Sequence, residues 1–460
     1  MASFVRYSPL LLLALVLAVP IAGPDALRWP IYATLLIWLA GVAGRTGRAE
    51  RGFLAAVAAS VAWISIFAAA PGAILIQAAD RGAQFVGMMV ALGLLRDAAR
   101  NSSIVRDCGV WLIAQKPAWR FLAIAAGGHG FGVALNMGAI LLLGTLIKRS
   151  NTLEAAGGDA RVVAIREERM NVALIQGFFS MMLWSPMAIS VAFSLALVPG
   201  VTWFDIGAPA LGLTALFFAL AWLLDRIKFP PSRSLAPPRE GKPPPVTMAL
   251  PMAGLILGLV GLVLGVKAYL HYGMIDAITN VAALFGLGWL YAGYHGRVQR
   301  PLTAAIQHLR RHAVEVLPEM RPETIVLASA SFLGVALAFL TRQWGVSGML
   351  DALHAPGWAL AVAIVLFVVA GGQIGIVAMV TTAIAGGAVL GMSASPLTPV
   401  ALVLTLQVGW TLSAVLSAYS GGTMLLARIA EVSPVVTRRW NLPWAALCFG
   451  IYAGLAYLFY

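Results

Sequence analysis

Charged side chains are scarce in this 460-residue chain, in which Asp, Glu, Lys and Arg together make up 11% and hydrophobic residues 60%. Soluble domains carry roughly a quarter charged residues. A chain with so little polar surface cannot cover itself in water, so the lipid bilayer is its solvent. Its length allows about a dozen crossings of roughly 20 residues each, together with loops.

Cysteine is nearly absent as well. Cys108 and Cys448 both stand in apolar sequence, which excludes a disulfide framework and leaves no spacing typical of metal ligands. The net charge of +13 would suggest a nucleic-acid partner in a soluble protein. In a membrane protein, basic residues instead collect in cytoplasmic loops. We therefore expect no nucleic acid, no metal centre and no organic cofactor.

Apolar runs between basic clusters predict the membrane topology. Residues 8–22 resemble a signal-peptide core without a good cleavage site, so we interpret them as an uncleaved first span with a cytoplasmic N-terminus. The expected spans are about 8–22, 29–44, 52–71, 82–96, 170–199, 208–225, 247–267, 275–293, 323–341, 399–431 and 441–459. As drawn, none of them carries Asp, Glu, Lys or Arg near its middle.

Two apolar stretches are broken by glycine and resemble each other: GGHGFGVALNMGAI (127–140) and GGQIGIVAMVTTAI (371–384). Basic residues flank 118–148 on both sides, so this segment enters and leaves the membrane on the cytoplasmic side as a re-entrant hairpin. Counting spans places a second hairpin, about 357–392, on the outer side.

The position of each hairpin tip is open on this reasoning. The first turns either at Gly127–Gly132 or at Leu135–Gly138. The second turns either at Gly371–Gly375 or at Thr381–Thr382.

The two halves of the chain follow one plan. LIQGFFSMMLWSP (174–186) aligns with LQVGWTLSAVLSA (406–418), which pairs Gly177 with Gly409 and Ser185 with Ser417. A proline-rich cytoplasmic linker, 226–246, separates residues 1–225, with an extra N-terminal span and the inward-side hairpin, from 247–460, with the outward-side hairpin. The predicted fold is an all-α polytopic membrane protein with about 11 transmembrane helices plus two re-entrant hairpins in two inverted-topology repeats.

Inverted repeats with discontinuous helices are typical of secondary transporters, where half-helix N-termini attract anions and free carbonyls coordinate Na⁺. The candidate residues for solute or ion binding are Asn136, Gly138, Ser185, Gln373, Thr381, Thr382, Ser417, Ser420 and Gly421. His129 is the candidate for proton coupling. Each side chain also has a structural alternative, as a helix cap or a hydrogen bond to its own helix.

ALNMGAILLLGTLI (134–147) and GLLRDAARNSSIVRDCGVWLIAQKPAWR (93–120) resemble the hairpin and the interfacial segment of the ion transporter superfamily, which includes divalent anion/sodium symporters and citrate and arsenite transporters. Leu135-Asn136 matches the family's hairpin tip, whereas Met137 replaces a polar residue. The resemblance favours tips at Asn136 and at Thr381–Thr382. It also implies a homodimer with an elevator-like movement of the hairpin domain.

The sequence thus predicts a multi-pass secondary active transporter of the bacterial cytoplasmic membrane, in contact with lipid. It moves a small anionic solute, a carboxylate or an oxyanion, coupled to Na⁺ or H⁺. The alternatives are a neutral solute and a Na⁺/H⁺-type antiporter; a channel and a membrane-embedded enzyme are less favoured. No cluster typical of a catalytic acid, base or nucleophile is present, so we do not expect an enzyme.

Overall fold

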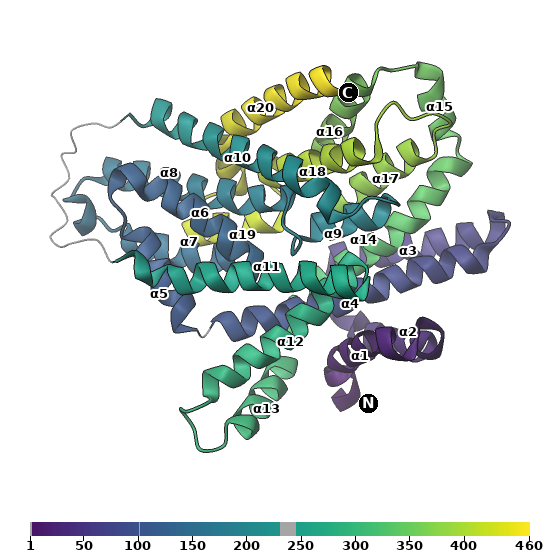
Figure 1. Ribbon diagram of the computed structural model, residues 1–460, viewed down its shortest axis with the longest axis horizontal. Coiled ribbons are helices and arrows are strands. Elements are labelled where there is room, and N and C mark those ends of the chain that lie inside the picture. The colour runs from purple at the N-terminus through teal and green to yellow at the C-terminus, as the bar shows by residue number, and fades with distance from the viewer. Residues whose placement is uncertain (1, 101, 231–244) are drawn as a thin grey trace. The chain divides into compact units, whose positions relative to one another are not determined.

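The chain is an all-α polytopic membrane protein, as predicted. The computed structural model describes residues 2–100, 102–230 and 245–460, and within them all regular structure is helical (Figure 1). Nine helices in this described part are long and apolar enough to cross a membrane, and they coincide with nine of the eleven expected spans. The other two expected spans, 82–96 and 170–199, fall in the longer helices α4 and α8–α9.

The helices group into two compact units that cut across the two halves of the sequence. Unit 1 comprises the described residues of Met1–Asn101, Gly261–Ala352 and Ala383–Ser393. Unit 2 comprises those of Ser102–Val260, Leu353–Thr382 and Ala394–Tyr460. Two helices, α11 (Leu250–Leu270) and α17 (Ala378–Leu390), contribute to both units. The predicted division at 226–246 concerns repeats and not compact units, and it stays a prediction.

Unit 1 is built around α4. Its other elements are α1 (Ala2–Ala22), α2 (Pro24–Val42), η1 (Ala43–Arg45), α3 (Arg48–Phe67), α12 (Met274–Tyr294), α13 (Pro301–Arg311), the π-helical η5 (His312–Val316), α14 (Leu317–Gln343) and most of α15 (Val346–Leu353). α4 packs mainly against α12, α14 and α1.

The extent of α4 corrects one expectation. It runs from Pro71 to Arg100 and not from about residue 82, so Asp80 and Arg81 lie inside it. The charge of Asp80 is compensated inside this helix, because the Tyr32 hydroxyl donates to its carboxylate at 2.6 Å and the Arg28 guanidinium lies 3.5 Å away. The expected span 82–96 therefore covers only part of this helix, and Asp80 and Arg81 precede that range.

Unit 2 holds the interrupted helices. Its elements are α5 (Ser103–Ile113), α6 (Pro117–Leu135), α7 (Gly138–Ser150), η2 (Glu154–Ala156), α8 (Ala160–Ser180), η3 (Met181–Leu183), α9 (Ile189–Leu197), α10 (Trp203–Lys228), η4 (Val246–Met248), α16 (Gly357–Gln373), α18 (Pro399–Leu416), α19 (Gly421–Ala430) and α20 (Pro434–Phe459). α18 is its central helix, since every residue from Ala401 to Val415 is buried.

The first Gly-rich stretch is a hairpin with its tip at Asn136–Met137, between α6 and α7. A Cβ at Gly127 would lie 2.3 Å from Leu112, and a Cβ at Gly109 would lie 2.8 Å from Leu146. Gly127 in α6 and Leu146 in α7 are equally far from the tip in sequence. Because both contact neighbouring turns of α5, the two arms of the hairpin run antiparallel to each other. Of the two tips considered, Leu135–Gly138 is therefore correct.

Both ends of this hairpin reach the same polar end of unit 2. Arg226 donates to the Ala118 carbonyl at 2.6 Å, and the neighbouring Lys228 pairs with Glu168. Lys148, at the other end of the hairpin, lies 3.6 Å from Glu167. This geometry supports a segment that enters and leaves on one side.

The second Gly-rich stretch turns at residues 374–377, between α16 and α17. Gly375 supplies the turn with a φ of +86°, which glycine adopts without strain. The preference for a tip at Thr381–Thr382 was wrong, because both threonines lie inside α17 and Thr381 donates to the Ala378 carbonyl of the same helix.

The second arm of this hairpin, α17, is divided between the two units. Gly371 and Thr381 are in contact beside the turn, within unit 2. Beyond Thr382, α17 belongs to unit 1, where Gly387 packs on Ala338 and Ser347 donates to the Ala388 carbonyl at 2.9 Å. Of the expected hairpin over 357–392, only the part up to Thr382 therefore belongs to unit 2.

Glycines hold the hairpin arms against the broken helices. A Cβ at Gly177 of α8 would lie 2.0 Å from the Ala125 carbonyl oxygen of α6, and one at Gly128 would lie 2.6 Å from the Leu174 carbonyl oxygen. In the second half, Gly409 of α18 faces α16 less closely, since a Cβ there would lie 3.2 Å from the Val368 Cβ. The aligned pair Gly177 and Gly409 thus occupies corresponding helix contacts.

This packing predicts that Gly177→Ala destabilises the protein by several kcal/mol or prevents folding, because the new methyl group would overlap backbone that cannot move aside. The matched control is Gly212→Ala in α10, where a Cβ meets nothing within 4 Å. The control gains up to about 1 kcal/mol from helix propensity. Thermal unfolding in detergent measures both variants, and equal melting temperatures would contradict the proposed backbone contact.

Candidate functional site

Three of the helix interruptions in unit 2 meet along one short segment, residues 417–422, which joins α18 to α19. The Ser417 hydroxyl donates to the Gly372 carbonyl at the end of α16 (2.6 Å). At the other end of the segment, a Cβ at Gly421 would lie 3.3 Å from the Met137 methyl group at the tip of the first hairpin. The segment therefore links the two turns that the sequence predicted.

The fourth interruption, between α8 and α9, is tied to the same helix. The Gln407 amide of α18 donates to the Ser190 carbonyl in the first turn of α9 at 3.0 Å. Ser185 is fully buried in the interruption, and its hydroxyl accepts from the Met187 amide at 3.2 Å. Ser185 therefore stabilises the break, as the structural alternative for this residue proposed.

Asn136 carries the most unusual backbone of the site. Its φ of +50° and ψ of −132° are rarely adopted by any residue other than glycine. The backbone is held by hydrogen bonds from the Asn136 amide to the Gly132 carbonyl and from the Ala139 amide to the Asn136 carbonyl, both 2.9 Å. The half-buried side chain has no hydrogen-bond partner among the described residues, so its amide is free for a ligand.

One helix N-terminus follows this amide in the chain, and a second lies against the side chain of the next residue, Met137. Gly138 is the first residue of α7, and Gly421 is the first residue of α19 and stands next to Met137. The first amides of a helix lack intrahelical acceptors and carry a partial positive charge. The Ser420 hydroxyl caps α19 by accepting a hydrogen bond from the Thr423 backbone amide at 3.2 Å. The backbone amides that precede Thr423 in the first turn of α19 do not bind this hydroxyl.

The turn of the second hairpin holds a cation that the sequence reasoning missed. Arg438, in the first turns of α20, lies 3.4 Å from the Gln373 side-chain oxygen. It is half-buried, whereas the adjacent Arg439 is exposed. The signal was present as an Arg-Arg pair just before the expected last span, but only the fold brings one of the two arginines to the turn.

His129 has both ring nitrogens engaged. The Trp184 indole donates to Nε2 at 2.9 Å, and Nδ1 lies 3.2 Å from the Gly177 carbonyl oxygen. Because an indole nitrogen only donates, the pattern assigns the proton to Nδ1. The ring joins α6 to α8 and to the η3–α9 loop, which favours a structural role over the predicted proton coupling.

Several buried polar atoms in unit 2 have no partner among the described residues. They are Asn151 Oδ1, Gln176 Oε1, Ser194 Oγ, Arg226 Nε, Thr382 Oγ1, Gln407 Oε1, Thr411 Oγ1 and Asn441 Oδ1. Only Thr382 belongs to the predicted site residues. Buried polar groups in native structures usually have a hydrogen-bond partner, so these atoms are candidates for contact with a ligand or water.

Gln407 and Trp410 of α18 both contact α9. The Gln407 amide donates to the Ser190 carbonyl, and one turn further the rings of Trp410 and Phe193 meet edge to face with 5.9 Å between their centroids. Thr411 and Ser194 each stand four residues beyond Gln407 and Ser190. The side-chain oxygens of Gln407, Thr411 and Ser194 have no partner among the described residues.

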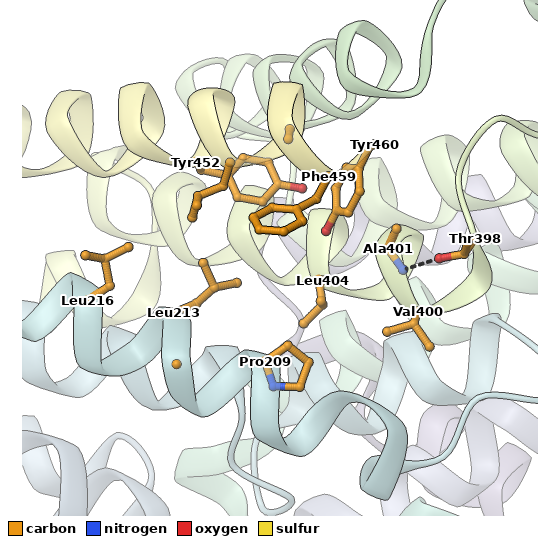
Figure 2. A pocket seen from close by; sticks show the side chains of 13 residues that line it. Pro209, Leu213, Leu216, Thr398, Val400, Ala401, Leu404, Tyr452, Phe459 and Tyr460 are labelled. Carbon is orange, nitrogen blue, oxygen red and sulfur yellow. Dashed lines mark hydrogen bonds between the residues drawn. The ribbon is translucent and has the colours of Figure 1, made fainter.

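A separate apolar pocket of about 440 Å³ opens between α10, α18 and α20. Tyr452 and Phe459 of α20 lie across it from Leu213 and Leu216 of α10 (Figure 2). None of the predicted site residues lines it. In the described part of the chain, no group of three or more His, Cys, Asp or Glu side chains could hold a metal ion.

No protein-family model and no curated protein matches the chain. Among solved structures, it is similar to the crystal structure of the Alcanivorax borkumensis YdaH transporter, which is described as having an unusual topology. The TM-score is 0.51 at 16% identity, over 83% of this chain and 86% of that chain. At this identity the likeness shows the fold, so the chain is a polytopic membrane protein with the fold of a transporter.

The backbone of Asn136 predicts opposite effects of two substitutions. Asn136→Gly keeps or raises the melting temperature, because glycine adopts this conformation without strain. Asn136→Ala lowers the free energy of unfolding by about 1–3 kcal/mol, because alanine must adopt the same positive φ, which asparagine tolerates better. Thermal unfolding in detergent measures both, and equal destabilisation by Gly and Ala would show that the amide makes structural bonds.

Proposed function

We propose that the chain is a secondary active transporter that moves a small anionic solute, a carboxylate or an oxyanion, across the bacterial cytoplasmic membrane by alternating access. The hairpin tip carries this proposal: the unpaired Asn136 amide precedes the N-terminus of α7, and the N-terminus of α19 lies against the Met137 side chain. Amides at helix ends bind anions without a charged side chain, and transporters with discontinuous helices use them in this way. The similarity of fold to a transporter supports the same class.

Arg438 supplies the charge that two helix ends lack. It lies next to Gln373 at the second turn, and Ser417 connects that turn to the segment that reaches Asn136. An anion held at the helix ends is therefore attracted by one half-buried guanidinium. This charge favours an anion over the alternative of a neutral solute, and it disfavours a pure Na⁺/H⁺ antiporter.

Substitution of the neighbouring Arg439 provides a matched control for the role of Arg438 in anion binding. Arg438→Gln weakens anion binding on the order of tenfold, because one charge-assisted interaction is lost. Arg439→Gln removes the same charge from an exposed position and leaves affinity nearly unchanged. The anion used to compare these affinities is identified first, by a thermal-shift screen of carboxylates, oxyanions and neutral metabolites on the purified wild-type protein. Equal affinities in both variants, or stabilisation by neutral compounds alone, would reject an anionic solute.

Na⁺ is the coupling ion that we propose. The three unpaired oxygens of Gln407, Thr411 and Ser194 are ligands of the kind that Na⁺ takes, and the two helices that carry them, α18 and α9, are joined by the hydrogen bond from Gln407 to Ser190. Proton coupling through His129 is the second candidate, but it would require protonation of the nitrogen that accepts from Trp184. His129→Gln, which keeps one donor and one acceptor, therefore leaves transport coupled.

Na⁺ coupling is tested by removing one hydroxyl. Thr411→Val raises the Na⁺ concentration for half-maximal uptake into proteoliposomes several-fold, because one oxygen ligand is replaced by a methyl group. The control is Thr214→Val in α10, a buried threonine whose hydroxyl donates to its own helix at Ala210. Uptake that is independent of Na⁺ in the wild-type protein, or equally affected in both variants, would exclude this site.

The remaining features of the proposal rest on the resemblance to the ion transporter superfamily. They are a homodimer and an elevator-like movement of the hairpin-bearing part of the chain. The cytoplasmic N-terminus that we propose rests instead on the positions of the basic clusters. Saturable, gradient-dependent uptake separates this transporter from a channel, and the mass of the detergent-solubilised protein tests the dimer. We propose transport and not catalysis.

A further inference from the structure

Unit 1 contains a cavity of about 520 Å³ between the start of α1, the end of α2 with η1, and the η5–α14 junction. Three arginines line it: Arg6 from α1, Arg45 from η1 and Arg321 from α14. The lining residues that the structure describes include no acidic side chain. None of the solute-binding residues proposed above belongs to this cavity.

The three arginines are unneutralised. Among the described residues, none of them makes an ion pair or a side-chain hydrogen bond. Arg6 and Arg45 are exposed and Arg321 is half-buried. Three like charges around one cavity repel each other, so the arrangement is stabilised when an anion lies between them.

The rest of the wall is apolar. Trp38, which is 5% exposed, lines the cavity together with Pro9 and Leu317. A soluble anion such as phosphate gains nothing from such a wall. A lipid headgroup carries its acyl chains with it, so a phosphodiester between the guanidinium groups brings hydrocarbon to the apolar side.

The three arginines come from distant parts of the sequence but share one predicted side of the membrane. Arg45 and Arg321 stand in basic clusters that the positive-inside rule assigns to the cytoplasm, and Arg6 stands near the N-terminus, which is predicted on the same side. Their meeting around one cavity fits that assignment, because helix ends on one side of a bilayer lie at the same level. The cytoplasmic leaflet is rich in anionic lipid, which supplies the occupant.

We propose that this cavity is a binding site for an anionic phospholipid, with Arg6, Arg45 and Arg321 around the phosphate and Trp38, Pro9 and Leu317 against the chains. Guanidinium groups suit this task because their planar donors match phosphate oxygens in pairs. The site is independent of the transported solute.

The test uses the full chain in detergent micelles. The probes are phosphatidylglycerol, phosphatidylcholine and inorganic phosphate, and the readouts are native mass spectrometry of lipid adducts and thermal shift. The variant is Arg45→Gln/Arg321→Gln. The matched control is Arg149→Gln/Arg439→Gln, which removes the same charge from two exposed positions outside the cavity. Size-exclusion elution checks that both variants are folded.

We expect wild-type protein to retain and be stabilised by phosphatidylglycerol, and to respond little to phosphatidylcholine or phosphate. The cavity variant binds phosphatidylglycerol about tenfold or more weakly, since each basic residue near an anionic lipid contributes on the order of 1 kcal/mol. The control variant binds like the wild type. Equal binding by both variants, equal binding of the two lipids, or a full shift by phosphate alone would overturn the proposal.

Discussion

Close backbone contact between each hairpin arm and its broken helix is the interaction on which the site depends. Helices in a bilayer gain no hydrophobic free energy from association, so they associate through dispersion contacts that small residues make possible. Gly177 and Gly128 bring the backbones of α6 and α8 together, and Gly409 lets α18 approach Val368 of α16. Without these contacts, the interrupted helices would leave unpaired amides and carbonyls facing lipid, which is costly.

The helix interruptions of unit 2 differ in whether their polar groups are paired within the protein. At the α8–α9 break, Ser185 and the Ser190 carbonyl are satisfied within the protein, so this break is mainly structural. At the first hairpin tip, the backbone of Asn136 is strained while its side chain stays unpaired. Strain that persists in an otherwise well-packed unit is typical of functional sites. Unpaired polar groups at the tip and satisfied ones at the break therefore distinguish the ligand site from its support.

The sequence predicted most of the helices because apolar length and basic flanks are local signals. The hairpin at 118–148, the break near Pro186 and the alignment of Gly177 with Gly409 also follow from local composition. The start of α4 was misjudged because hydropathy treats Asp80 as a boundary, whereas Tyr32 and Arg28 compensate its charge. The tip at Thr381–Thr382 was wrong because it rested on resemblance, and Gly375 offered the better turn residue.

The contribution of Arg438, Gln407 and Thr411 could not be found in the sequence. Gln407 and Thr411 are isolated polar residues within an apolar run, and Arg438 belongs to an Arg-Arg pair beside one; such residues most often cap or cross-link helices. Only the fold brings Arg438 to the end of α16 and Gln407 to the first turn of α9. The apolar pocket beside α20 gave no such convergence of polar groups, although it is a well-formed cavity.

The central claim is that the first hairpin tip binds the transported anion, and cysteine labelling at Met137 tests it most directly. The native Cys108 and Cys448 are buried, so the wild-type protein serves as the unlabelled control. We expect a membrane-impermeant maleimide to label Met137→Cys in sealed vesicles and the transported anion to slow that labelling. A cysteine that is unreactive from both sides, or labelling unaffected by every anion that stabilises the protein, would contradict the account.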